Sequence, residues 1–312
     1  MKTSLSSSIT KAASKQTYYT FRYLVDRQRV PDAYRAYAYF RWIDDKIDQS
    51  TLDPSEQIAF IDRQKAIMDS CYRGQRPGNL TPEECMLADL IETGQEKNSG
   101  LQSYIRNMMA VIDFDARRRD RLITEIELNE YTRWLAIAVT EAMHHFIGNG
   151  WYAPQDETRY LAVSGAHIIH MLRDTYDDVQ AGYFNVPLEV LESNHIGPQE
   201  VNSDAYRVWV KSRVKLARED FEAGRGYLAR VQNPRCRLAG FAYIARFEWL
   251  LNTIEKEGFY LRPEYSERKS IRVGLQMSWI ALSSMVKLRG AANPPAPSVS
   301  YPVSKPGKLL WK

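Results

Sequence analysis

Apolar residues recur at intervals of three and four along most of the chain, which is the spacing of one face of an α-helix. The series Leu135, Val139, Ala142, Met143 and Phe146 is an example. Runs in which β-branched and polar residues alternate, the pattern of half-buried strands, are nearly absent. The pattern therefore predicts an all-α protein, with about ten helices between residues 17 and 289.

Short polar segments divide the apolar series and predict where helices begin. Residues 53–56, 81–84 and 124–127 each combine a capping side chain with a glutamate three positions later. Residues 197–200 (GPQE) and 233–235 (NPR) mark two further starts. Because no linker rich in Pro, Gly or Ser interrupts these segments, we expect a single helical bundle with its functional site between the helices.

The two ends of the chain differ from the rest in composition. Residues 1–16 are rich in serine, basic and free of acids, which predicts a flexible N-terminus. Residues 290–312 contain five prolines and no helical period, which predicts a flexible tail. The helical domain is therefore expected over residues 17–289.

Composition limits the kinds of partner. The net charge of +4 is too small to indicate nucleic-acid binding, and we interpret the basic triplet at residues 117–119, flanked by aspartates, as a solvated helix face. Cys71, Cys85 and Cys236 are scattered, which favours free thiols in a reducing compartment over disulfides or a zinc site. No apolar run approaches the ~18 residues of a membrane span, so we expect a cytoplasmic protein, soluble or associated with a membrane surface.

Two clusters of aspartates lie about 130 residues apart, each at the end of an apolar helical segment: Asp44, Asp45 and Asp48, and Asp174, Asp177 and Asp178. A solvated face paired with nearby arginines would explain either cluster alone. Two clusters that face one cavity would create a strongly negative potential, which a hard divalent cation relieves. The pair therefore predicts bound Mg²⁺, with Mn²⁺ as the alternative ion, whose oxygen shell a diphosphate completes.

Three segments resemble the squalene/phytoene synthase family. Residues 17–48, which end in YFRWIDDKID, resemble its aromatic start followed by Y-A-F-x-R-x-x-D-D-x-x-D. Residues 108–139 are similar to its segment G-M-x-x-D-L…R-Y…L-x-x-Y-C-x-x-V-A, and residues 170–187 resemble N-I-L-R-D-x-x-x-D-x-x-x-G-R-x-Y-L-P. The resemblance extends over about residues 17–285. It implies a single-domain helical bundle of the isoprenoid synthase type that encloses a central cavity.

The resemblance also implies a reaction. Members of the family join two prenyl diphosphates head to head, in a Mg²⁺-dependent prenyltransferase reaction that passes through a cyclopropyl diphosphate. For this chain it implies farnesyl or geranylgeranyl diphosphate as the substrate and a squalene-type or phytoene-type product, or the cyclopropyl diphosphate itself. A squalene-type product would need NADPH, for which no Gly-rich dinucleotide motif is visible.

Site residues follow from the same resemblance, position by position. It assigns metal binding and catalysis to Asp44, Asp45, Asp48, Asp174 and Asp178, and proton removal to Tyr131. It assigns substrate contacts to Arg41, Arg173, Asp177, Tyr18, Tyr19, Arg22, Tyr37, Phe40 and His170. Ion pairing with local aspartates is the alternative for the two arginines beside the clusters, and packing in the core is the alternative for the aromatic residues.

Some positions depart from the family pattern. His167 and His170 stand where Gln and Asn are usual, Glu141 replaces a small residue, and Tyr183 replaces an arginine. Glu141 also forms an E-x-x-H pair with His144, which leaves open a di-metal redox enzyme, although such proteins use two of these pairs. A non-catalytic family member that acts as an assembly or interaction factor is the other alternative. The presence of both aspartate clusters favours an active enzyme.

Overall fold

The computed structural model describes residues 4–47, 53–94 and 99–266. Within these ranges it contains eleven α-helices, two short 3₁₀ helices and no strand, so the predicted all-α class is confirmed. Asp48, the end of the expected domain and the tail at residues 290–312 lie outside the described residues.

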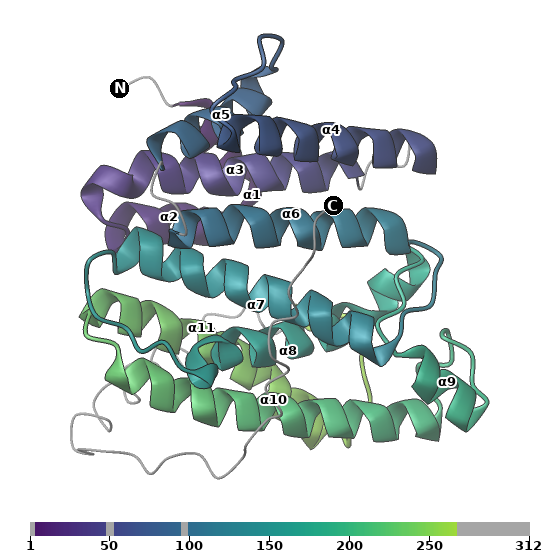
Figure 1. The fold of residues 1–312 in the computed structure, drawn as a ribbon. Coiled ribbons are helices and arrows are strands. Elements are labelled where there is room, and N and C mark those ends of the chain that lie inside the picture. The colour runs from purple at the N-terminus through teal and green to yellow at the C-terminus, as the bar shows by residue number, and fades with distance from the viewer. Residues whose placement is uncertain (1–3, 48–52, 95–98, 267–312) are drawn as a thin grey trace.

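The helices run roughly parallel or antiparallel to one another across the molecule (Figure 1). Their bounds are α1 (Leu5–Ala13), α2 (Lys15–Leu24), α3 (Val30–Ile47), α4 (Pro54–Tyr72), α5 (Pro82–Thr93), α6 (Gly100–Arg118), α7 (Glu125–Ile147), α8 (Leu161–Gln180), α9 (Leu188–Asn194), α10 (Asp204–Arg230) and α11 (Pro234–Lys256), with 3₁₀ helices at Arg27–Arg29 and Glu157–Tyr160. In succession, α6 packs on α7, α7 on α8, and α8 on both α10 and α11.

Most of the predicted helix starts are confirmed. Asp53, Thr81 and Thr124 each accept a hydrogen bond from the backbone at the third helical position, and the glutamate there accepts one from the cap residue. Asn233 caps α11 by accepting from two backbone N–H groups. These ends form where the sequence predicts because capping depends on side chains within one turn.

The predicted start at residues 197–200 is wrong. The Glu200 carboxylate accepts a hydrogen bond of 2.7 Å from the backbone N–H of Gly197, but it closes a turn and no helix follows at once. The next helix, α10, begins at Asp204 and is capped by Ser203. The local pattern of a cap and a following glutamate is thus shared by turns and helices.

Part of the segment expected to be flexible forms α1 instead. Ser6, Ser7 and Thr10 are buried in this helix, which packs on α3. The hydroxyl of Thr10 donates a hydrogen bond of 2.8 Å to the carbonyl of Ser6 one turn earlier. Small hydroxyl side chains that bond to their own helix can be buried without other partners. A serine-rich composition therefore does not prevent packing here.

Helix α8 carries the second aspartate cluster and lies very close to α10. A Cβ atom at Gly165 of α8 would lie 2.9 Å from the carbonyl oxygen of Ala217. A Cβ atom at Gly224 of α10 would lie 2.7 Å from the backbone nitrogen of Ala162. Glycine is required at both positions for this close approach, which fixes α8 relative to α10.

The interior of the bundle is apolar and aromatic. Tyr39, Tyr206, Phe221 and Tyr227 are among its largest almost completely buried side chains. The long helices still carry charged residues on their outer faces. In the described part of the chain, no helix is both long enough and apolar enough to cross a membrane.

Candidate active site

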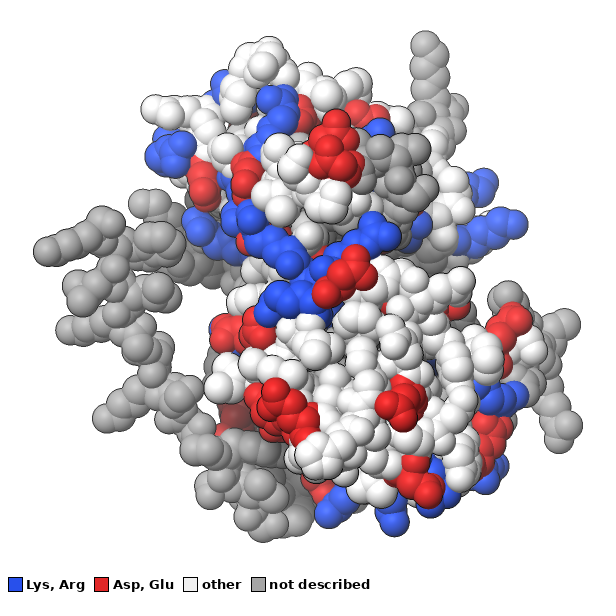
Figure 2. Space-filling model, turned by 90° about the vertical axis from the view of Figure 1, so that its right-hand side faces the viewer, with Lys and Arg blue, Asp and Glu red and all other residues white. Residues whose placement is uncertain are grey.

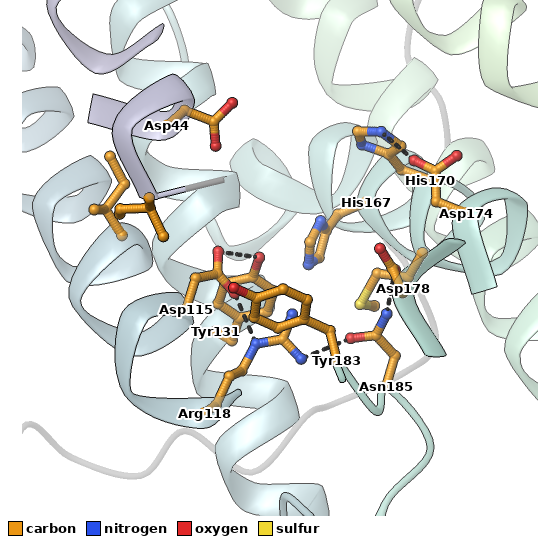
Figure 3. Close-up of a pocket in the computed structure, with 13 residues that line it drawn as sticks. Asp44, Asp115, Arg118, Tyr131, His167, His170, Asp174, Asp178, Tyr183 and Asn185 are labelled. Atoms are coloured by element: carbon orange, nitrogen blue, oxygen red, sulfur yellow. Dashed lines mark hydrogen bonds and ion pairs between the residues drawn. The ribbon is translucent and has the colours of Figure 1, made fainter. Parts of the chain in front are cut away.

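A cavity of about 270 Å³ opens between α3, α6, α7 and α8 at one end of the bundle (Figure 3). It is lined by Asp44, Ile47, Ile112, Asp115, Arg118, Tyr131, His167, His170, Met171, Asp174, Asp178, Tyr183 and Asn185. The two aspartate clusters therefore reach the same cavity, with Asp44 at the end of α3 and with Asp174 and Asp178 at the end of α8.

Arg118 is the buried centre of a hydrogen-bond network on one wall. Its Nε donates to Asp115 Oδ1 over 2.7 Å, and its Nη1 donates to Asn185 Oδ1 over 2.9 Å. The guanidinium also lies 5.1 Å from the ring centre of Tyr183 and 5.0 Å from that of Tyr131. These contacts hold a positive charge against the cavity.

The interpretation of residues 117–119 as a solvated face is wrong for Arg118, which is 5% exposed. Its neighbour Arg117 does face outward, where it pairs with Asp62 and Asp113. Successive helix positions are rotated by about 100°, so three consecutive arginines cannot all share one face. Both Arg117 and Arg118 have an aspartate one turn earlier, so the sequence does not show which of the two is buried.

Tyr131 is buried on the same wall as Arg118. Its hydroxyl donates a hydrogen bond of 2.8 Å to Asp115 Oδ2. Burial, followed by the charge of Asp115, raises the pKa of Tyr131 well above its ordinary value. The hydroxyl therefore stays protonated, and its proton is directed toward Asp115.

The two cavity carboxylates of α8 have opposite pKa shifts. Burial and then the neighbouring Asp174 raise the pKa of Asp178 to about 7, although Asn185 donates a hydrogen bond of 2.7 Å to Asp178. Burial also opposes ionisation of Asp174, but hydrogen bonds from His170 and Arg173 outweigh it and lower the pKa. This wall thus carries an ionised carboxylate, Asp174, beside Asp178, whose ionisation is opposed first by burial and then by the charge of Asp174.

On the facing wall, Arg41 pairs with both aspartates at the end of α3. Its Nη1 donates to Asp44 Oδ2 over 3.1 Å, and its Nη2 donates to Asp45. Asp44 lines the cavity and Asp45 does not. Of the first cluster, the structure therefore brings Asp44 together with the aspartates of α8.

Among the residues expected to contact substrate, His170 lines the described cavity and the others do not. Arg41 and Arg173 form ion pairs with aspartates. Asp177 lies on the exposed side of α8, and Phe40 lies in the core. The remaining residues lie along α2 and the facing part of α3: Tyr18, Tyr19, Arg22 and Tyr37. The Phe40 ring centre lies 5.1 Å from that of Tyr39 and 5.4 Å from that of Tyr104, in aromatic core packing.

His167 reaches the middle of the cavity from α8 (Figure 3). It is 5% exposed, and neither of its buried ring nitrogens has a hydrogen-bond partner among the described residues. Its ring centre lies 5.0 Å from that of Tyr131. Burial, followed by the nearby His170, Arg118 and Arg213, lowers the pKa of His167 to about 3. The ring is therefore neutral at ordinary pH.

The E-x-x-H pair belongs to a separate buried network. Glu141 accepts hydrogen bonds of 2.7 and 3.1 Å from Arg159 and one of 2.9 Å from Tyr160. His144 Nε2 lies 2.7 Å from the hydroxyl of Tyr227. No group of three or more His, Cys, Asp or Glu side chains in the described ranges is arranged to hold a metal ion. These residues therefore form a structural network, and the di-metal alternative has no support in it.

The carboxylates of the cavity fit Mg²⁺ when a ligand supplies further oxygens. In Figure 3, Asp44 lies across the cavity from Asp174 and Asp178, so their oxygens face a common space from two sides. Mg²⁺ is usually held by one or two carboxylates together with substrate phosphates and water, and needs no complete cage of protein ligands. Burial, and then the charge of Asp174, raises the pKa of Asp178, and a bound divalent cation would favour its ionised form.

Known proteins resemble this chain in sequence and in structure. The model of the family described as squalene/phytoene synthase matches residues 10–275. A 15-cis-phytoene synthase from Synechocystis sp. is 24% identical, and the match covers 85% of this chain and 81% of the relative.

Two solved structures share the fold. Squalene synthase HpnC from Alicyclobacillus acidocaldarius matches with a TM-score of 0.65 and 20% identity, covering 83% of this chain and 94% of that one. A dehydrosqualene synthase solved in complex with a ligand matches with a TM-score of 0.67 and 16% identity, covering 92% and 96%. The expected fold of an isoprenoid synthase is thereby confirmed.

Proposed function

Because the chain belongs to the squalene/phytoene synthase family, we propose that it condenses two prenyl diphosphates head to head in the cavity between α3, α6, α7 and α8. Farnesyl and geranylgeranyl diphosphate are the expected substrates. One observation carries the proposal: Asp44 lines the same cavity as Asp174 and Asp178, although about 130 residues separate it from them in the sequence.

These three aspartates would hold Mg²⁺ in the proposed reaction. The ion, when bound, supplies positive charge that stabilises the departing diphosphate. The described structure supports this role through the two carboxylate-bearing walls and the raised pKa of Asp178. Asp45, which does not line the cavity, would act indirectly by holding Arg41 beside Asp44.

Among the described residues, Arg118 is the one best suited to bind the diphosphate directly. Its charge is buried, and Asp115 and Asn185 fix its guanidinium against the cavity. A preorganised positive charge in a site of low dielectric constant stabilises developing negative charge without having to reorient. Arg118 would thus orient the leaving group opposite the carboxylates.

The surface around this end of the bundle would help to attract an anionic substrate. Figure 2 shows Lys and Arg side chains gathered in a band across the end of the molecule where α6 ends and α7 begins. The end of α6 and the following turn contribute Arg117, Arg119 and Arg121, which are exposed. Acidic side chains pair with Arg117 and Arg121, so Arg119 would contribute most to attracting an anionic ligand.

The apolar part of the cavity would protect a carbocation from water. Ile47, Ile112 and Met171 line it beside the charged groups. The cavity of about 270 Å³ is smaller than the ~300–1,000 Å³ of typical ligand pockets, so in this conformation it fits the diphosphate end of a substrate rather than two whole chains. Exclusion of water is needed because a cation of this kind is otherwise captured by solvent.

A direct test is to incubate the purified protein with farnesyl or geranylgeranyl diphosphate, with Mg²⁺ present or chelated and NADPH present or absent. We expect a Mg²⁺-dependent hydrocarbon with twice the carbon count of the substrate, detected by mass spectrometry of the organic extract. A folded protein that condenses neither substrate would contradict the proposal and favour a non-catalytic role in assembly or interaction.

A further inference from the structure

We propose that His167 accepts the proton that ends the condensation, so that the protein makes a hydrocarbon with a central C=C bond and needs no reductant. This inference rests on the proposed function of the cavity. It goes further by assigning the product to the phytoene or dehydrosqualene type and by giving a role to a residue that departs from the family pattern.

The imidazole of His167 has an unusual environment. His167 lines the cavity from α8. Both of its ring nitrogens are buried and have no hydrogen-bond partner among the described residues. A buried polar group without a partner lowers stability, so its presence calls for a role with a ligand. A neutral imidazole carries one nitrogen with a free lone pair, which is the group that a base needs.

The other titratable groups of the cavity all have partners. The Tyr131 hydroxyl donates to Asp115, so it would have to release a proton that burial holds on the phenol. Asp115, which also lines the cavity, accepts from Arg118 and Tyr131. Asp174 accepts from Arg173 and pairs with His170, and Asp178 accepts from Asn185.

These two aspartates would also be occupied by the metal and the diphosphate. Asp44, on the facing wall, pairs with Arg41. Among the described titratable side chains that line the cavity, His167 is the base whose ring nitrogens have no hydrogen-bond partner.

Ionisation of the cyclopropyl diphosphate and rearrangement leave a cation at the newly joined carbons. When a C–H bond on the adjacent carbon breaks, its electron pair becomes the central C=C bond and its proton forms an N–H bond with the free nitrogen of His167. The diphosphate leaves as an anion and later receives the proton from the imidazolium. No electrons enter from outside, in contrast to a squalene-type product, for which NADPH delivers a hydride.

Low basicity does not prevent this step. Burial disfavours the imidazolium, but a carbocation loses a neighbouring proton far more readily than an imidazolium does. A weak, uncharged base also has an advantage in this position, because it can lie in the apolar interior without a counter-ion. The negative charge of the departing diphosphate would stabilise the imidazolium once it forms.

The product of the unaltered protein is the first measurement. Incubation with each prenyl diphosphate and Mg²⁺, with and without NADPH, should give the same hydrocarbon in both cases, with a conjugated central triene visible in its ultraviolet spectrum. A product with a saturated central bond that appears only with NADPH would overturn the inference. An alcohol whose oxygen comes from labelled water would overturn it as well.

The second measurement compares His167→Phe with His144→Phe, a matched loss of a buried histidine in the network outside the cavity. We expect His167→Phe to lower the rate of hydrocarbon formation by roughly 100-fold while the rate of cyclopropyl diphosphate formation changes by less than about threefold, so that this intermediate accumulates. His144→Phe should leave the ratio of intermediate to hydrocarbon unchanged. A purely structural role of His167 would slow both steps together.

The outcomes separate this inference from the function on which it rests. If the unaltered protein condenses neither substrate, the proposed function itself fails. If it makes the unsaturated hydrocarbon and His167→Phe makes it at the same rate, the condensation stands and His167 is not the base. In that case the departing diphosphate takes the proton.

Discussion

Arg118 of α6 donates a hydrogen bond of 2.9 Å to Asn185, which lies beyond the end of α8. Asn185 in turn donates one of 2.7 Å to Asp178. A single amide thus joins the arginine that we expect to bind diphosphate to an aspartate that we expect to bind Mg²⁺. The two sides of the proposed catalytic array are therefore held in a fixed relation before any ligand arrives.

Replacing Asn185 with alanine should weaken both stability and activity. The change leaves one buried nitrogen of Arg118 and one oxygen of Asp178 without partners, which we expect to lower the free energy of unfolding by about 1–3 kcal/mol. We also expect kcat/KM to fall by roughly 10-fold or more, because a site that is less well ordered loses orientation of its reacting groups. Urea denaturation and steady-state kinetics measure the two effects. Asn129→Ala, at an exposed position of α7, is the control and should change neither.

His167→Phe should make the protein more stable although less active. Phenylalanine has a similar shape and removes two buried nitrogens that lack partners in the described structure. We expect the free energy of unfolding to rise by about 1 kcal/mol, measured by urea denaturation in the absence of ligands. A decrease of similar size would show that the ring nitrogens are hydrogen-bonded in solution and would weaken the case for a ligand-directed role.

Glu141→Ala should destabilise the protein without changing the product. Arg159, whose side chain is 4% exposed, would lose its buried partner, and a buried unpaired charge costs about 3–5 kcal/mol. Glu130→Ala removes the exposed ion pair with Arg133 on the same helix, so it should cost less than about 1 kcal/mol. Thermal or urea unfolding of the pair tests the network. Equal stability of the two variants would contradict it.

The stability of the free protein should carry a pH dependence from Asp220 of α10. Burial raises the pKa of this carboxyl to about 7, outweighing the opposing charge of Arg213, and Glu219 raises it further. In the unfolded chain the pKa of an aspartate is about 3.9, so between pH ~4 and ~7 the folded state binds the proton more tightly. The contribution of Asp220 is therefore present at low pH and is lost as the pH rises through this window.

Asp220→Asn removes that dependence. Its stability relative to the unaltered protein should increase from pH ~4 to ~7 by about 2–4 kcal/mol and then level off. Glu222→Gln, at an exposed position of the same helix, should show a flat difference. A flat difference for Asp220→Asn would mean that this carboxyl ionises normally in the folded state.

Local signals in the sequence are enough to predict part of the fold and part of the candidate site. The caps at Thr124 and Asn233 form as predicted because they depend on a few neighbouring residues. The all-α class follows from the apolar period. The meeting of Asp44 with Asp174 in one cavity was predicted because both clusters stand at the end of an apolar helical segment.

Other features depend on contacts between distant segments. The sequence does not reveal that Arg118 meets Asn185, or that Phe40 lies in the aromatic core rather than in the cavity, because helical spacing fixes a face but not its neighbour. The close approach of α8 to α10 at Gly165 is of the same kind. The roles of Asp48 and Tyr131 remain predictions.

The central claim is that the aspartates facing the cavity, and not acidity along α8 in general, support the condensation. Asp174 lines the cavity, whereas Asp177 lies three positions later on the exposed side of the same helix. Asp174→Asn and Asp177→Asn therefore make the same chemical change inside and outside the proposed site.

The most direct measurement is the rate at which each variant forms the condensed hydrocarbon from farnesyl or geranylgeranyl diphosphate at saturating Mg²⁺, quantified by mass spectrometry. We predict that Asp174→Asn lowers this rate by at least about 100-fold, because it removes a ligand of the Mg²⁺ that would stabilise the leaving diphosphate. Asp177→Asn should retain the rate of the unaltered protein. Full activity in Asp174→Asn, or equal loss in both variants, would contradict the account.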